Sequence, residues 1–196
     1  MHFFTSDLHF GDDEIIEREA RPFKDIKEFE DVFVSNVNKV ASREDTLYVI
    51  GDWINYNKSH HPCTQDAFEM CRRLYPAVVL VLGNGERRLM ADRYHDDLNE
   101  MKRSLQSFGV SDVVDSAYIE FGGERFFLTH HPVDHASDCT TLFGHTHRGT
   151  GLWKPFGLNV GVDLNHFRPF SEADILGLLK TKREWWDVDP DALCMS

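Results

Sequence analysis

Residues 46–52, Thr-Leu-Tyr-Val-Ile-Gly-Asp, form an apolar run that ends in a glycine and a carboxylate. A near-continuous run of this kind is typical of a short strand covered on both faces, and the glycine marks the end of the strand. Four further segments have the same pattern, namely residues 1–6, 77–82, 125–129 and 140–143. Helical patterns lie between these runs, so the sequence predicts an α/β fold.

Each predicted strand is followed by side chains that bind metal ions. In chain order these are Asp7-Leu8-His9, Gly51-Asp52, Gly83-Asn84-Gly85, His130 and Gly144-His145-Thr146-His147. The seven donors are two carboxylates, one amide and four imidazoles. This mixture of oxygen and nitrogen ligands suits Mn, Fe, Zn, Ni or Co. Ligands in α/β sheets gather beyond the carboxyl ends of the strands, so we expect the five segments to converge on one crevice.

Taken singly, these segments have ordinary structural explanations. An Asp-x-His sequence after a strand is commonly a turn or a helix cap, and Asn84-Gly85 alone would be read as a tight turn. The two imidazoles of Gly-His-Thr-His must both be either solvated or coordinated. The joint occurrence of all five segments in this order favours a metal site.

The order D-x-H, G-D, G-N, H, G-H-T-H resembles that of the calcineurin-like metallophosphoesterase superfamily. Residues 159–171, NVGVDLNHFRPFS, are similar to the end of its small single-domain prokaryotic and phage phosphoesterases, and the likeness spans roughly residues 1–171. It implies a first metal site, a second metal site and a bridging carboxylate. The implied ligands are Asp7, His9 and His147 for the first ion, Asn84, His130 and His145 for the second, and Asp52 for both.

The resemblance also implies a fold and a reaction. The fold is a four-layer α-β-β-α sandwich, in which two mixed sheets are packed face to face and flanked by helices. The reaction is hydrolysis of a phosphoester by hydroxide bound between two divalent ions about 3.5 to 4 Å apart, which needs no protein nucleophile. Ions this close repel each other, so a shared carboxylate such as Asp52 suits the site. We expect manganese, with iron, zinc, nickel or cobalt as alternatives.

Gly85 departs from the family pattern. The family usually reads GNHD or GNHE, whereas this chain reads Gly83-Asn84-Gly85-Glu86, so the histidine that protonates the leaving group is missing. General acid catalysis is typically worth ~10²–10⁴ in rate. A site without it would act slowly on poor leaving groups or recruit another acid. A third explanation is that residue 85 was altered to trap a ligand.

Four other residues are candidate substrate contacts besides Asn84. Arg87 and Arg88 follow the incomplete motif where a helix is predicted to begin, and either can hold a phosphate or be solvated surface charge. His166 lies in a loop-like segment that can reach the mouth of the crevice. His131 follows a ligand directly, and strand alternation predicts that it points away from the metals. We therefore assign substrate binding to Asn84, Arg87 and His166.

Composition limits the class of protein. A chain of 196 residues without a linker or internal repeat suits one domain spanning residues 1–196. Its net charge of −12 would become about −8 with two divalent ions, which is too negative for long duplex nucleic acid. A small phosphoester or nucleotide is the expected substrate. The four cysteines show no C-x-x-C spacing and are expected to be reduced. Without a signal or membrane-spanning pattern, the protein is expected to be cytoplasmic.

The remaining segments complete the expected fold. Residues 25–41 have an apolar stripe at three- and four-residue steps, which indicates an amphipathic helix, and residues 64–74 and 87–108 are expected to be outer helices. Residues 117–121 and 158–162 are expected strands, and Gly122-Gly123 is expected to form a hairpin turn. His60 and His61 fall in a loop that can line the entrance. Trp185 and Trp186 belong to an acidic surface tail that can anchor on the core or on a partner.

The sequence thus predicts a metal-dependent phosphoric ester hydrolase, with a slight preference for phosphodiesters over phosphomonoesters. A diester with a good leaving group needs less protonation, which suits a site without the usual histidine. One alternative is a noncatalytic metal- or nucleotide-binding module on the same fold, and replacement of Gly85 by histidine is expected to activate only a hydrolase. Another alternative is a mononuclear zinc hydrolase. The natural substrate and the oligomeric state are left open.

Overall fold

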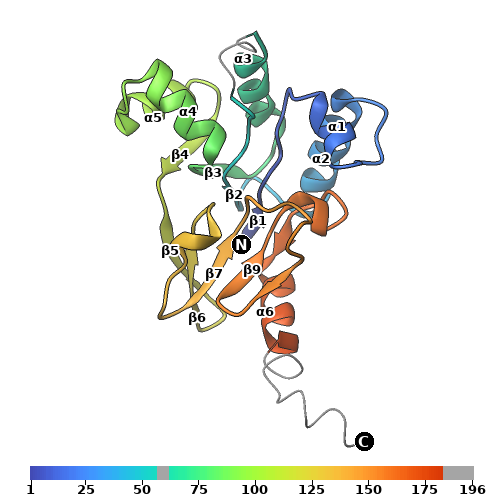
Figure 1. Ribbon diagram of the computed structural model, residues 1–196, viewed down its shortest axis with the longest axis vertical. Helices are drawn as coiled ribbons and strands as arrows, with labels where there is room; N and C mark the ends of the chain where they lie inside the picture. The colour runs from blue at the N-terminus through green and yellow to red at the C-terminus, as the bar shows by residue number, and fades with distance from the viewer. Residues whose placement is uncertain (57–61, 183–196) are drawn as a thin grey trace, which may run out of the picture.

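The fold contains two five-stranded mixed sheets (Figure 1). This computed structural model describes residues 1–56 and 62–182. The first sheet has the order β10-β1-β2-β3-β4, in which β1 to β4 are parallel and β10 is antiparallel to β1. Its strands are β1 (His2–Thr5), β2 (Thr46–Ile50), β3 (Ala77–Val81), β4 (Val110–Val114) and β10 (Phe170–Ser171).

The strands of the first sheet that precede candidate ligands end level with one another. Thr5 is opposite Val49 across β1 and β2, and Ile50 is opposite Val81 across β2 and β3. Because these strands are parallel, their carboxyl ends meet at one edge of the sheet. The candidate ligands that follow at this edge are Asp7, Asp52 and Asn84.

The second sheet has the order β5-β6-β7-β9-β8, with a parallel centre of β6, β7 and β9. Its strands are β5 (Ala117–Phe121), β6 (Glu124–Leu128), β7 (Thr140–Phe143), β8 (Trp153–Lys154) and β9 (Gly157–Asn159). The predicted Gly122-Gly123 hairpin is confirmed, since it joins antiparallel β5 and β6. An isolated bridge between Ser6 and Gly161 ties the carboxyl ends of β1 and β9 together, so both sheets present their ends to one place.

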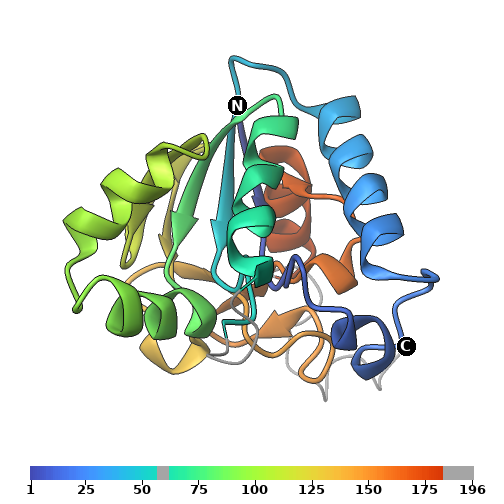
Figure 2. The same cartoon turned by 90° about the horizontal axis from the view of Figure 1, so that it is seen from above.

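Helices cover one face of the first sheet, and the second sheet covers the other. In Figure 2, helices α2 to α5 lie on the near side of the first sheet. Alternate residues of each strand enter different cores: Phe3, Val49 and Leu80 pack with the helices, whereas Phe4, Ile50 and Val81 pack with the second sheet. The helices are α1 (Glu14–Arg18), α2 (Ile26–Val40), α3 (Pro62–Glu69), α4 (Asn84–Arg93), α5 (Leu98–Gln106) and α6 (Glu172–Thr181). The predicted α/β class, with two mixed sheets flanked by helices, is confirmed.

The prediction of one continuous helix over residues 87–108 is wrong, because this segment contains two helices. The two helices are α4 and α5, and the left-handed φ values of His95 (50°) and Asp96 (62°) interrupt the helix between them. Asp97 then caps α5 by accepting the backbone N–H groups of Asn99 and Glu100. The predicted helix over residues 64–74 is α3 followed by a 3-10 turn, η2 (Met70–Arg73). The strand predicted over residues 158–162 ends at Asn159, and the 3-10 turn η4 (Val162–Leu164) follows.

Several expectations concern residues with little or no structural description. His60, His61, Trp185 and Trp186 lie outside the described residues. Of the cysteines expected to be reduced, Cys71 and Cys139 are free thiols, and Cys194 lies outside the described residues. Within residues 1–56 and 62–182, none of the helices combines the length and the apolar character that a membrane span requires.

Candidate metal centre

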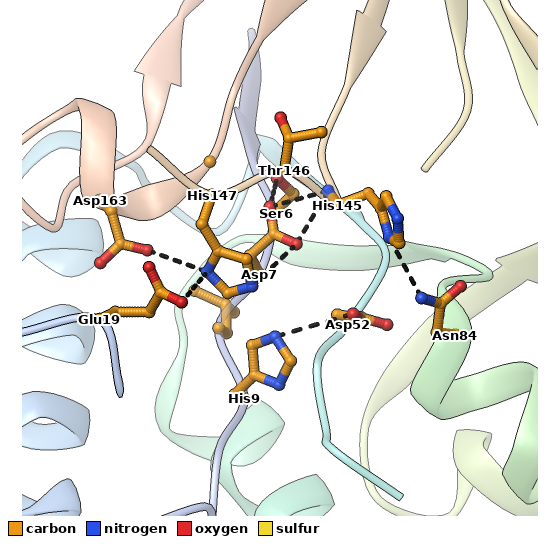
Figure 3. A network of polar contacts seen from close by, with 12 residues as sticks. Ser6, Asp7, His9, Glu19, Asp52, Asn84, His145, Thr146, His147 and Asp163 are labelled. Carbon is orange, nitrogen blue, oxygen red and sulfur yellow. Dashed lines mark hydrogen bonds and ion pairs between the residues drawn. The ribbon is translucent and has the colours of Figure 1, made fainter. Parts of the chain in front are cut away.

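Asp7 connects the ends of the two sheets. Its carboxylate, at the end of β1, accepts the backbone N–H of His145, which follows β7, with distances of 2.9 and 3.1 Å to its two oxygens (Figure 3). Nε2 of His147 lies 4.0 Å from Oδ1 of Asp7. The rings of His147 and His9 stack with their centroids 5.1 Å apart. The three residues assigned to a first metal ion therefore lie together.

Asp52 faces imidazoles from both implied sites. Its Oδ2 lies 3.7 Å from Nε2 of His9 and 3.4 Å from Nε2 of His130. Its Oδ1 accepts the backbone N–H of Gly85 at 2.9 Å. This backbone contact orients the carboxylate and leaves Oδ2 directed at the two imidazoles. Such a central position is the one that a bridging ligand requires.

The three residues assigned to a second ion are also neighbours. Nδ2 of Asn84 donates to Nδ1 of His145 at 3.1 Å. The rings of His145 and His130 lie edge to face with centroids 5.3 Å apart. Nδ1 of His130 donates to the carbonyl oxygen of Ile50 at 2.8 Å, which directs its Nε2 toward the cluster. All seven predicted residues are thus linked by short contacts.

Several buried imidazole nitrogens of this cluster lack hydrogen-bond partners in the described part of the chain. Among the described residues, both ring nitrogens of His9, Nε2 of His130 and Nδ1 of His147 are buried without one. A buried polar group left unsatisfied costs about 1–3 kcal/mol. Cations would satisfy the lone pairs of Nε2 in His9 and His130. The donor set therefore fits metal ions.

Two overlapping groups have donors close enough to hold an ion, since their ligand atoms all lie within 4.8 Å of one another. The groups are Asp7, His9 and His147, and Asp7, Asp52 and His130. Asp7 occurs in both groups, whereas the family resemblance assigns it to one ion only. The described residues can therefore bind a metal in this region.

The backbone of the cluster is strained. Five of the seven predicted ligands have left-handed φ values, namely Asp7 (59°), His9 (54°), Asp52 (53°), His145 (71°) and His147 (45°). Each such conformation in a residue other than glycine costs on the order of 1–3 kcal/mol and persists only where the surroundings enforce it. Strain concentrated in this way on one group of polar residues is a mark of a functional site.

Close packing of the strand ends depends on glycine. A Cβ at Gly51 would lie 2.5 Å from Cγ of His130 and 2.7 Å from Cα of Gly83, and Gly51 has a φ of +79°. No side chain fits there without separating the ends of β2 and β3 from His130. The glycine seen in the sequence as the end of a strand therefore also lets the cluster assemble.

Gly85 is enclosed by the segment that follows β2. A Cβ at this position would overlap the carbonyl oxygen of Ile54 and lie 2.9 Å from the carbonyl carbon. It would also lie 3.3 Å from the backbone nitrogen of Tyr56. A histidine at residue 85 would therefore have to displace backbone, so replacement of Gly85 by histidine is not the clean test expected from the sequence. The close contact gives a packing reason for glycine in this chain.

Burial and mutual charge set the protonation of the cluster. Burial lowers the pKa of His9 to about 3, despite the nearby carboxylate of Asp52. Burial also raises the pKa of Asp7. Burial opposes the charged form of His130, but the facing carboxylate of Asp52, 3.4 Å from Nε2, outweighs it and raises the pKa of His130 to about 9. The same pairing holds the pKa of Asp52 below its usual range against the effect of burial.

Several supporting residues have no clear signal in the sequence. Glu86 is fully buried, and its carboxylate accepts the backbone N–H groups of Asp52 and Gly83 at 2.9 Å and of Ile54 at 3.2 Å. Burial and the charge of Asp52 raise the pKa of Glu86 to about 7. Its place as the fourth residue of Gly-Asn-Gly-Glu was visible, but its burial was not. Arg21 and Asp163, which form a buried ion pair beside the cluster, were likewise missed.

The other candidate substrate contacts lie apart from the ligands or have other partners. Arg87 pairs with Asp115 at 2.7 Å on the surface, and Arg88 is exposed. His166 is exposed, and its side chain makes no hydrogen bond, ion pair or ring contact with the described part of the chain. His131 does not point away from the cluster, because β6 ends at Leu128 and the chain bends. Its ring centroid lies 4.1 Å from that of His145.

Comparison with known proteins shows similarity of fold alone. No protein-family model matches the chain, and no curated protein matches it. A protein of unknown function from Aquifex aeolicus, AQ665, is similar in its crystal structure, with a TM-score of 0.64 and 25% sequence identity. The similarity covers 91% of this chain and 98% of that chain. It supports the α/β arrangement over nearly the whole length of both proteins.

Proposed function

We propose that this chain is a dinuclear metal-dependent phosphoesterase of the calcineurin-like superfamily, with the four-layer fold of that family. The observation that carries the proposal is the convergence of seven oxygen and nitrogen donors from five strand ends. Several of their buried imidazole nitrogens have no hydrogen-bond partner among the described residues. Structural packing has no need of such a set, whereas two divalent cations do.

The proposed roles are those that the resemblance implies, and the short contacts among the seven residues support them. Asp7, His9 and His147 hold one ion, Asn84, His130 and His145 hold the other, and Asp52 holds both. When bound, the ions supply Lewis acidity to the phosphoryl oxygens and lower the pKa of a water nucleophile. Glu86 and the backbone N–H of Gly85 orient Asp52 for this role. Manganese is the proposed ion.

The substrate is proposed to be a small phosphodiester or nucleotide. No side chain at residue 85 can protonate the leaving group, because the carbonyl of Ile54 occupies the space beside Gly85. Substrates whose leaving groups are stable as anions depend less on such an acid. Asn84 is the proposed contact with the phosphate. The surface pairing of Arg87 with Asp115 would have to open before Arg87 could take that role.

A noncatalytic metal-binding module is the second candidate, and the glycine at residue 85 favours it. The two candidates differ in turnover and not in metal binding. Metal content and hydrolysis therefore have to be measured on the same preparation.

The test combines elemental analysis with hydrolysis of bis(p-nitrophenyl) phosphate and p-nitrophenyl phosphate in the presence of Mn²⁺. We expect two ions per chain and Mn²⁺-dependent release of nitrophenol. Two ions without turnover on these substrates or on cyclic nucleotides would favour the binding module. One zinc ion per chain with hydrolysis would favour a mononuclear enzyme. The absence of metal binding would refute both the dinuclear phosphoesterase and the metal-binding module.

A further inference from the structure

Arg21 and Asp163 form a buried ion pair beside the candidate metal centre. Nε and Nη2 of Arg21 donate to Oδ1 and Oδ2 of Asp163 at 2.9 and 3.0 Å. The side chains are 0% and 1% exposed. Arg21 also donates to the carbonyl oxygens of Asp7 at 2.7 Å and Leu8 at 2.9 Å. The pair therefore joins the segment after α1 to the segment after β9, and both to the backbone of a candidate ligand.

The carboxylate of Asp163 faces the ring of His147. Its Oδ2 lies 3.5 Å from Nδ1 of His147, a buried atom without a hydrogen bond among the described residues. On the other side of the ring, Nε2 lies 4.0 Å from Asp7 (Figure 3). Asp163 is therefore placed to accept a hydrogen bond from the Nδ1–H group and to direct Nε2 toward the cluster. A carboxylate behind a metal-binding imidazole commonly has this effect.

Stability alone does not account for a buried pair of this kind. Removing two charges from water is unfavourable, and a well-packed apolar pair of similar volume is often at least as stable. The pair is nevertheless held from several directions. The guanidinium of Arg21 lies 4.5 Å from the ring centroid of Phe29, and it also donates to the carbonyl oxygens of Asp7 and Leu8. The two hydrogen bonds from Arg21 hold the carboxylate of Asp163, and the ring of Phe29 packs against the guanidinium that donates them.

We propose that Asp163, held by Arg21, is a positioning residue that orients His147 and strengthens binding of a divalent cation by Asp7, His9 and His147. This inference rests on the metal-binding part of the proposed function. Asp163 does not touch the ion or the substrate, and it acts through the imidazole. Its loss weakens one cation site and leaves the other intact.

Glu19 provides a matched comparison. Its Oε1 lies 3.9 Å from the same Nδ1 of His147, but its side chain is 19% exposed and has no arginine partner among the described residues. If any nearby negative charge were sufficient, Glu19→Gln and Asp163→Asn would have similar effects. If the held geometry matters, only Asp163→Asn affects cation binding strongly.

The experiment is calorimetric titration of the metal-free protein with MnCl₂. For Asp163→Asn we expect one binding event to weaken by ~10–100-fold, the usual effect of removing a partner behind a metal ligand. The other event and the Glu19→Gln variant should match the wild type. Imidazole ¹⁵N spectra of the Zn²⁺-loaded protein should show Nδ1 of His147 protonated in the wild type and a mixture of ring forms in Asp163→Asn.

A second variant covers the case in which Asp163→Asn fails to fold, because that change leaves Arg21 buried without its anion. Arg21→Gln with Asp163→Leu removes both charges and keeps an amide donor for the two carbonyl oxygens. It should fold and still show the weakened event. Wild-type Mn²⁺ affinity in this folded variant, equal weakening of both events, or a larger loss in Glu19→Gln would overturn the inference alone. A wild-type protein that binds no Mn²⁺ would overturn it together with the proposed function.

Discussion

The backbone of Gly85 lies against the carbonyl group of Ile54 with no space for a side chain between them. Gly85→Ala should therefore destabilise the protein by about 1–3 kcal/mol, the usual effect of overpacking a well-packed region. The measurement is thermal or urea unfolding of the metal-free protein. Gly177→Ala in α6 is the control, since its Cβ would meet no atom within 4 Å. That control should raise stability by about 0.5–1 kcal/mol. Equal effects of the two changes would contradict the packing argument.

Asp52 is the second test case, because its Oδ2 faces both His9 and His130. Asp52→Asn should cost both ions and nearly all turnover, since a neutral amide cannot offset the repulsion of two cations. Elemental analysis after dialysis against Mn²⁺ gives the metal content. The control is Asp138→Asn, which removes a carboxylate from an exposed pair with Arg125. Full metal content in Asp52→Asn would refute the bridging role.

The sequence predicted the strand ends well because both signals are local. A buried strand is a run of apolar residues, as in residues 46–50, and the polar residue after the glycine is visible beside it. Parallel pairing then brings such ends together, so the convergence of Asp7, Asp52 and Asn84 followed from the α/β class. The lengths of β2 and β7 were predicted to the residue.

Long-range contacts were not predictable in this way. Arg21 and Asp163 are 142 residues apart and meet only because the segments that carry them dock together. The surroundings of Gly85 were not predictable either. Its sequence context indicates only a missing histidine, whereas the structure shows that the carbonyl group of Ile54 encloses its backbone. Strand alternation also could not predict the orientation of His131, because the chain bends after Leu128 and turns this residue toward His145.

Removal of metal should lower the stability of the wild type. Ring nitrogens of His9 and His130 are buried without hydrogen-bond partners within the described ranges, and they would become metal ligands when ions bind. At a free ion concentration ~100 times Kd, one bound ion adds about 2.7 kcal/mol. For a domain of this size that corresponds to ~5–10 °C in Tm. Scanning calorimetry with Mn²⁺ and with a chelator measures the difference, and identical Tm values would contradict it. The Asp52→Asn protein should show a much smaller shift.

Affinity for Mn²⁺ should rise with pH. The pKa of His130 is about 9 without metal, so this imidazole is protonated at neutral pH and must release its proton before it can bind an ion. Raising the pH toward 9 removes this competition, by about tenfold per pH unit for each proton displaced. His9 contributes nothing to this dependence above pH 5, because its pKa is about 3. Titrations at pH 6.5 and 8.0 in buffers of different ionisation enthalpy measure both affinity and proton release. Binding without proton uptake by the buffer would show that the site is already deprotonated.

The enclosed position of Gly85 leads to an expectation about the leaving group. Without an acid at that position, the rate should fall steeply as the leaving group becomes a stronger base. A series of aryl phosphodiesters with phenols of graded pKa, assayed with Mn²⁺, gives the slope directly. Alkyl esters should react slowest, by at least the ~10²–10⁴ that a general acid ordinarily supplies. Hydrolysis of simple alkyl phosphomonoesters far faster than of activated diesters would show that another group delivers the proton, and His131 beside His145 would then be the first residue to replace.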